Sequence, residues 1–210
     1  MTSGDVKLCI VCDSAISANI FATLAMQVIQ PMVLRLQDKH VGSKLTVGIV
    51  TYTTPTTRPA IVARRAFTQA GALFPLFRDA PHSIGIGTSG SGGPIGMAVL
   101  EGLVAAIEMC DDVLEAASRR QRASHPSIPA QSSSTPIFHL LLIGGSRSDA
   151  ARRPFYNRST LLDDTTWDTL PDELKKRNIN LSLCLSNQIK ELVTLHTKAN
   201  RSSSIRTLRF

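Results

Sequence analysis

Val6-Lys-Leu-Cys-Ile-Val-Cys12 is a short, continuous apolar run that ends at the polar stretch Asp13-Ser-Ala-Ile-Ser17. A run of this length is typical of a central parallel strand that is buried on both faces. We expect Ser17 to cap a helix over about 17–37. Pro31 lies inside that helix and predicts a kink or an early end, because proline has no amide hydrogen to donate. The expected buried side of the helix consists of Ile20, Leu24, Val28, Met32 and Leu36.

The alternation of strand and helix continues along the chain. Pro94 should open a long helix, since proline is tolerated at the first helical position, and Met97 should lie on its buried side. Further strands are expected at 45–52, 60–66, 137–143 and 179–185, and further helices at 67–77, 166–177 and 187–196. This order predicts an α/β, Rossmann-like fold. We expect a doubly wound, mostly parallel sheet with one antiparallel edge strand, and helices on both faces.

The chain of 210 residues is long enough for one substantial domain, which we place at 1–197. Ser118 to Pro136 is rich in serine and proline and has no periodicity, so we predict a disordered insertion at 118–136. Residues 198–210 are expected to form a basic, flexible tail. The N-terminus lacks a basic region followed by an apolar core, so no signal peptide is expected.

The net charge is +7, with 23 Lys and Arg against 16 Asp and Glu. The cations are spread over polar segments and the tail, and aromatic residues make up only 5% of the chain, so few stacking platforms exist for single strands. We therefore expect no specific nucleic-acid partner. No apolar run approaches the ~18 residues of a membrane helix, so no membrane partner is expected either.

Cys9-Ile-Val-Cys12 has the C-x-x-C spacing of zinc and redox motifs. It lies within a predicted strand, where residues three apart point to opposite faces. No second C-x-x-C accompanies it, and the histidines lack ligand-like spacing. Buried free thiols are therefore the favoured interpretation.

Loops at the carboxyl ends of the parallel strands are the expected place for function. Gly85-Ile-Gly-Thr-Ser-Gly90 matches G-x-G-x-x-G literally, but it does not follow the first strand and is separated from its helix. A flexible loop is favoured there over a dinucleotide site. No P-loop pattern occurs, so neither a nucleotide cofactor nor a small-molecule substrate is expected.

The same loops carry part of a magnesium-binding pattern. Asp13 and Ser17 could supply a carboxylate and a hydroxyl, but Ala15 occupies the position between them. The second loop offers Ile95 and the third offers Gly144-Gly145, where a hydroxyl and a carboxylate would be needed. We expect Asp13 and Ser17 to be remnants of a degenerate site, with Ser17 as a helix cap and Asp13 bonded to nearby amides.

No arrangement of nucleophile, base and carboxylate is apparent, and no G-x-S-x-G motif occurs. Asp111-Asp112 and Asp163-Asp164 are adjacent carboxylates that solvation and helix capping explain. The sequence therefore predicts a protein without enzymatic activity.

Three features together resemble a von Willebrand factor type A domain: the Asp-x-x-x-Ser after the first strand, the Gly-rich loop leading to a helix, and the strand His139-Leu-Leu-Leu-Ile-Gly-Gly145. The longer stretch from Gly90 to Asp112, with its Glu-Gly-Leu and Asp-Asp, is similar to the Mediator complex subunit 25 family. Two further stretches are similar to the same family, namely Leu174 to Leu183 and Leu192 to His196. The resemblance extends over residues 5 to 197.

This resemblance implies a scaffold without a cofactor that docks onto Mediator subunits in the nucleus, in a coactivator linking activators to RNA polymerase II. It also implies a degenerate metal site. Asp13, Ser17, Thr88 and Arg147 are the candidate protein contacts, because all four lie on the inferred ligand face.

Other interpretations remain open from the sequence. A metal-dependent A-type ligand-binding module could recruit Thr88, Ser91, Ser146 or Asp149. The chain could instead be an A-type subunit of a proteasome, repair or general transcription complex. A small α/β enzyme that binds phosphate with the loop Gly85 to Gly93 is a third possibility.

Overall fold

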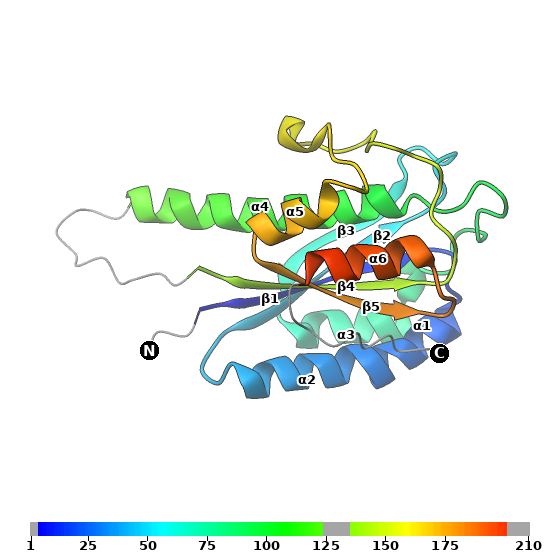
Figure 1. The fold of residues 1–210 in the computed structure, drawn as a ribbon. Helices are drawn as coiled ribbons and strands as arrows, with labels where there is room; N and C mark the ends of the chain where they lie inside the picture. The colour runs from blue at the N-terminus through cyan, green and yellow to red at the C-terminus, as the bar shows by residue number, and fades with distance from the viewer. Residues whose placement is uncertain (1–3, 124–134, 201–210) are drawn as a thin grey trace.

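The computed structural model describes residues 4–123 and 135–200, which form a five-stranded sheet covered by helices (Figure 1). The strand order is β3-β2-β1-β4-β5. β3 runs antiparallel to β2 at one edge, and the other neighbouring pairs are parallel. The α/β fold class, the mostly parallel sheet and the antiparallel edge strand are therefore confirmed. The strands are β1 (Val6–Asp13), β2 (Leu45–Tyr52), β3 (Ile61–Thr68), β4 (Ile137–Gly144) and β5 (Ile179–Leu185).

The central strand β1 divides the interior into two hydrophobic cores. Its side chains alternate between them, so that Cys9 lies in one core and Cys12 in the other. Both thiols are free and buried, as the favoured interpretation predicted. A shared zinc ion or a disulfide between them is incompatible with these opposite directions.

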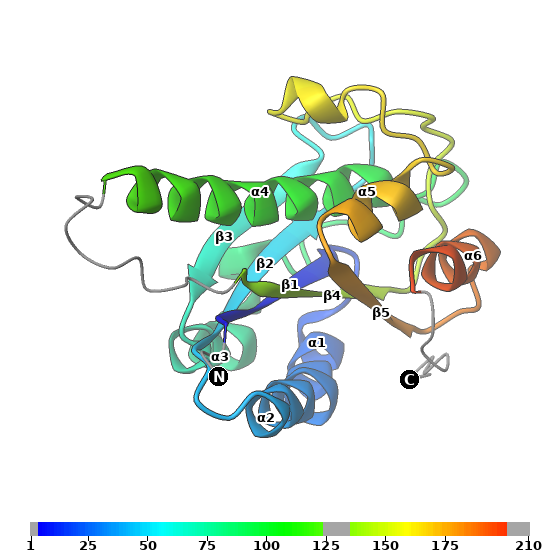
Figure 2. The ribbon, with the colours of Figure 1, turned by 60° about the vertical axis from the view of Figure 1, so that its left-hand side comes forward.

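Helices cover both faces of the sheet (Figures 1 and 2). The core that contains Cys9 includes residues of three helices, α4 (Val99–Ala123), α5 (Leu170–Lys176) and α6 (Lys190–Ala199). The core that contains Cys12 includes residues from α1 (Ala18–Leu24), the π-helical turn η1 (Ala25–Ile29), α2 (Gln30–Lys39) and α3 (Ala70–Asp79). Two short 3₁₀ helices, η2 (Pro81–Ile84) and η3 (Thr160–Leu162), lie in the connections.

The first helical segment differs from its prediction at Pro31. The helix does not end there but continues to Lys39, because the preceding turn, η1, is a π turn and Pro31 occupies a first-turn position of α2. The predicted buried side is also wrong in part, since Ile20 is 47% exposed. The predicted Leu24 and Leu36 are buried, and the predicted Val28 and Met32 pack against the core half-buried. The other buried residues of this side are Phe21, Ala25, Ile29 and Val33.

By length and composition alone, Ala18–Lys39 could cross a membrane, although no apolar run of that length was expected from the sequence. In the structure one side of this segment packs into the hydrophobic core beneath the sheet. Length and composition alone do not distinguish such a packed helix from a membrane helix.

The long helix α4 begins at Val99, and the prediction that Pro94 opens it is wrong. Met97 is held in extended conformation, because its N–H donates to the Arg147 carbonyl and its carbonyl accepts from the Asp149 N–H. Gly96, with φ of 84°, makes the turn before it. The other helices also begin later than predicted, at Ala70, Leu170 and Lys190.

The predicted disordered insertion at 118–136 is wrong at its start. α4 continues through 118–123, and Arg119 pairs with Glu115 one turn earlier. Residues 124–134 lie outside the described part of the chain. The predicted tail 198–210 also begins too early, since Lys198 belongs to α6 and lies 3.6 Å from Asp168. Residues 201–210 lie outside the described part.

Candidate functional site

The loop after β1, the connection 85–98 and the loop after β4 meet at the carboxyl edge of the parallel strands, as the sheet topology predicts. The loop after β1 contacts the Gly-rich loop, because the Gly87 N–H donates to the Ser14 carbonyl at 2.9 Å and the Ser14 and Ser89 hydroxyls share a hydrogen bond. The segment before α4 joins the loop after β4 through Met97 and Arg147. The predicted contact residues therefore lie in neighbouring loops of one edge.

Two buried carboxylates lie at this edge: Asp13, with 1% of its surface exposed, and Asp149 in the loop after β4, with 9% exposed. The Asp13 Oδ1 accepts a hydrogen bond from the Ala15 N–H at 2.8 Å. Burial raises the pKa of Asp13, and the Ala15 amide, the Ser146 hydroxyl and the amides of 145 and 146 oppose that rise by favouring the charged form. Asp13 thus bonds to a nearby amide, as the sequence predicted.

The other three predicted residues have exposed or local roles. The Ser17 Oγ caps α1 by accepting from the Ile20 N–H at 3.4 Å, which confirms the predicted cap. The Thr88 Oγ1 donates to the Gly85 carbonyl at 2.7 Å. Arg147 is exposed, and its carbonyl holds Met97. Their role as protein contacts stays a prediction.

A divalent cation at this edge would need several oxygen ligands at once. Asp13 Oδ2 is buried without a hydrogen-bond partner in the described chain, which is one feature of such a site. Asp149 Oδ1 is buried without a hydrogen-bond partner among the described residues as well, but Ala15, Ile95 and Gly144 offer no side-chain oxygen. Among residues 4–123 and 135–200 no group of three or more His, Cys, Asp or Glu could hold a metal. The positions that would complete the magnesium-binding pattern, Ala15, Ile95 and Gly144, therefore lack the oxygen ligands that such a site needs.

Gly85 of the Gly-rich loop is required by close packing and by its backbone conformation. Gly85 has a φ of 81°, and a Cβ on it would lie 2.6 Å from Val62 Cγ1. Gly85 thus allows a close approach to β3, and no phosphate is needed to explain it. The bonds of Ser14, Gly87 and Thr88 described above join the first part of this loop to its neighbours, and the flexibility of the loop stays a prediction.

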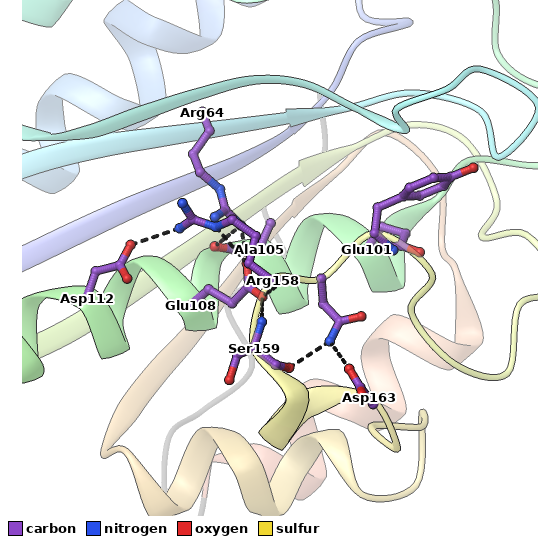
Figure 3. Close-up of polar contacts among 10 residues, drawn as sticks. Arg64, Glu101, Ala105, Glu108, Asp112, Arg158, Ser159 and Asp163 are labelled. Atoms are coloured by element: carbon purple, nitrogen blue, oxygen red, sulfur yellow. Dashed lines mark hydrogen bonds and ion pairs between the residues drawn. The ribbon is translucent and has the colours of Figure 1, made fainter.

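A second polar site was missed by the sequence reasoning. Glu101 and Glu108 lie two turns apart on the buried side of α4, at 4% and 2% exposure. Glu101 accepts hydrogen bonds from the N–H groups of Phe155 and Tyr156. Glu108 accepts hydrogen bonds from the backbone N–H groups of Arg158 and Ser159 (Figure 3). We call this pair of carboxylates the α4 clamp, because it fastens the connection between β4 and α5.

Basic side chains complete the α4 clamp. Arg64 of β3 donates to Glu108 at 2.5 Å and to the Ala105 carbonyl at 3.1 Å. Arg158 pairs with Asp112 at 2.9 Å, so that carboxylate is not simply solvated as predicted. A seven-residue spacing of two glutamates on an apolar helix side was the signal that could have revealed this site.

Comparison with known proteins supports the fold. The sequence matches no protein-family model, and it matches no curated protein. The N-terminal domain of TFIIH p34 superposes with a TM-score of 0.54 at 12% identity, over 94% of this chain and 88% of that one. The human COPII-coat protein Sec24c superposes with a TM-score of 0.51 at 15% identity, over 99% of this chain and 29% of the Sec24c chain.

A third solved structure, the pilus adhesin SpaC from Lactobacillus rhamnosus GG, gives a TM-score of 0.50 at 12% identity. It matches 96% of this chain and 28% of its own. TFIIH p34 and Sec24c have von Willebrand A-like domains, so the A-type fold is confirmed for this chain. At these identities the likeness concerns the fold alone.

Proposed function

We propose that this chain is a docking domain without enzymatic activity, which holds a subunit in a transcription complex of the nucleus. The observation that carries the proposal is the carboxyl edge of the sheet. Oδ1 of Asp13 is bonded to the Ala15 amide, Ser17 caps α1, and Thr88 donates to the Gly85 carbonyl of its own loop. An edge built in this way offers surfaces for protein contact rather than reacting groups.

The sequence resemblance to Mediator complex subunit 25 supports Mediator subunits as the partners. TFIIH p34, a subunit of a transcription factor, has the same fold, which is consistent with a place in the transcription machinery. Sec24c belongs to a coat complex, so the fold also serves other assemblies.

The test is affinity capture from nuclear extract of the source cells, at moderate salt, with bound proteins identified by mass spectrometry. Moderate salt is required because a chain of net charge +7 attracts acidic contaminants. Stoichiometric recovery of Mediator subunits is the expected result. Recovery of a proteasomal or repair complex instead would overturn the Mediator assignment.

A titration with Mg²⁺ tests the metal-dependent interpretation on the same protein. We expect no rise in melting temperature at millimolar Mg²⁺. A rise that Asp13→Asn abolishes, and that the surface variant Asp38→Asn retains, would contradict the proposal and favour the metal-dependent module.

A further inference from the structure

The connection between β4 and α5 exposes two large apolar side chains. Phe155 is 74% exposed and Leu161 is 85% exposed, and Tyr156 beside Phe155 is 37% exposed. They belong to Ala151-Arg-Arg-Pro-Phe-Tyr-Asn-Arg-Ser-Thr-Leu161, which we call the 151–161 segment. Single exposed apolar residues are common on proteins, but here they are concentrated on one short segment.

The backbone of the 151–161 segment is held in place despite its exposure. The α4 clamp accepts four of its N–H groups, and Asn157 donates to the Ser159 carbonyl at 2.8 Å and to Asp163 at 2.6 Å. Pro154, within the segment, and Leu162, just after it, are buried. Figure 1 shows the connection lying over α4. Burying the carboxylates of Glu101 and Glu108 costs desolvation energy, which their hydrogen bonds to the segment offset. These bonds order the 151–161 segment before any partner binds, so its exposed apolar groups form an ordered platform.

The charge of this platform indicates the chemistry of its partner. The 151–161 segment contains three arginines and no acidic residue. Arg152 and the nearby Arg147 are exposed and have no acidic partner among the residues that the structure describes. Arg153 and Arg158 pair with Asp164 and Asp112, but their side chains stay more than half exposed.

We propose that the 151–161 segment binds an acidic protein segment that carries apolar side chains. Phe155 and Leu161 insert between the partner's apolar groups, and Arg147 and Arg152 pair with its carboxylates. The inference rests on the proposed function, since the partner is a subunit of the captured complex. A nucleic acid fits less well, because Leu161 offers no stacking surface and the acidic pair Asp163-Asp164 begins two residues after it.

The test uses the full chain in the complex that it captures. The photo-crosslinking substitutions Phe155→p-benzoylphenylalanine and Leu161→p-benzoylphenylalanine are compared with the same substitution at Met26 and Leu34. The two control residues are each 52% exposed and belong to the helices of the opposite sheet face. We expect crosslinks from 155 and 161 to one acidic, apolar stretch of one subunit.

Binding is then measured for the double variant Phe155→Ser/Leu161→Ser and the matched control Met26→Ser/Leu34→Ser. The first should weaken binding of the crosslinked subunit at least about tenfold, since buried aromatic anchors dominate interfaces, and the second should leave it unchanged. The variant Arg147→Ala/Arg152→Ala should reduce the salt dependence of binding. The melting temperature of every variant checks that the fold is retained.

The outcomes separate the inference from the proposed function. Capture of the complex with equal binding by both serine variants, or with crosslinks only from 26 and 34, overturns the inference and leaves the proposed function standing. Crosslinks from 155 and 161 to nucleic acid overturn it in favour of a nucleic-acid surface. Failure of the unmodified chain to capture any complex overturns both.

Discussion

The guanidinium group of Arg177 forms two parallel hydrogen bonds with the carboxylate of Asp111, at 2.7 and 2.9 Å. Arg177 directly follows α5, and Asp111 lies in the middle of α4, so the pair joins two helices that cover the same core. The Arg177 side chain is only 8% exposed and also contacts Glu173. A bidentate pair in such surroundings is stronger than an exposed one.

Asp111→Ala should destabilise the protein by about 2 kcal/mol, because it leaves the buried Arg177 with fewer acceptors. Urea unfolding followed by circular dichroism measures the loss. The neighbouring Asp112 is the matched control, since its partner Arg158 is 61% exposed. Asp112→Ala should cost less than about 1 kcal/mol. Equal costs for the two variants would contradict the importance of the partly buried Arg177–Asp111 pair.

Gly102 of α4 lies against the ring of Tyr52, which is buried in β2. A Cβ at position 102 would lie 2.5 Å from Tyr52 Cδ1 and 3.1 Å from Val11 Cγ1. Gly102→Ala should therefore destabilise by about 1–2 kcal/mol, since overpacking outweighs the better helix propensity of alanine. Thermal unfolding provides the measurement.

Gly71 is the control for that substitution, because it lies in α3 and a Cβ there would meet nothing within 4 Å. Gly71→Ala should be neutral, or stabilising by up to about 1 kcal/mol. A Gly102→Ala variant as stable as Gly71→Ala would show that Tyr52 and α4 adjust without cost.

The strands were predictable almost to the residue where the sequence has long apolar runs. β2 and β5 begin and end where predicted, and β4 extends the prediction by Gly144 alone, because burial on both faces requires such runs. The helix starts were less predictable. Met97 looks like a helical core residue, but its bonds to the loop after β4, some 50 residues away in the sequence, hold it extended.

In the candidate site too, local contacts were predictable from the sequence and long-range contacts were not. The contacts of Asp13 with Ala15 and of Ser17 with Ile20 are local, so residue type and spacing predicted them. The partners of Glu101 and Glu108 lie about fifty positions further on, in the 151–161 segment. No local pattern contains that information, because backbone N–H groups look alike in every sequence.

The four cysteines should be unreactive in the folded protein. All are buried, and burial raises the pKa of Cys9 to about 12 and that of Cys184 to about 11. The thiolate is the reactive form, so a disulfide-exchange reagent should label almost none without denaturant and all four in guanidinium chloride. Rapid native labelling of Cys9 and Cys12, or stoichiometric bound zinc, would contradict the burial of the C-x-x-C thiols in opposite cores.

His139 of β4 should make stability depend on pH. Burial, with smaller contributions from the nearby His40 and Lys39, lowers its pKa in the folded protein from 6.5 to about 4. Between these values the unfolded chain binds the proton and the folded chain does not, so the contribution to stability is complete above pH 6.5 and is lost as the pH falls toward 4.

The variant His139→Leu removes this titration and places an apolar side chain of similar size at the same position of β4. Between pH 7 and 4.5 the unmodified protein should lose about 2 kcal/mol more stability than the variant. Urea unfolding of both proteins at each pH gives the difference, in which the carboxylates with raised pKa values, such as Asp13 and Glu101, cancel. Parallel stability profiles would mean that His139 takes up its proton in the folded protein as readily as in the unfolded chain.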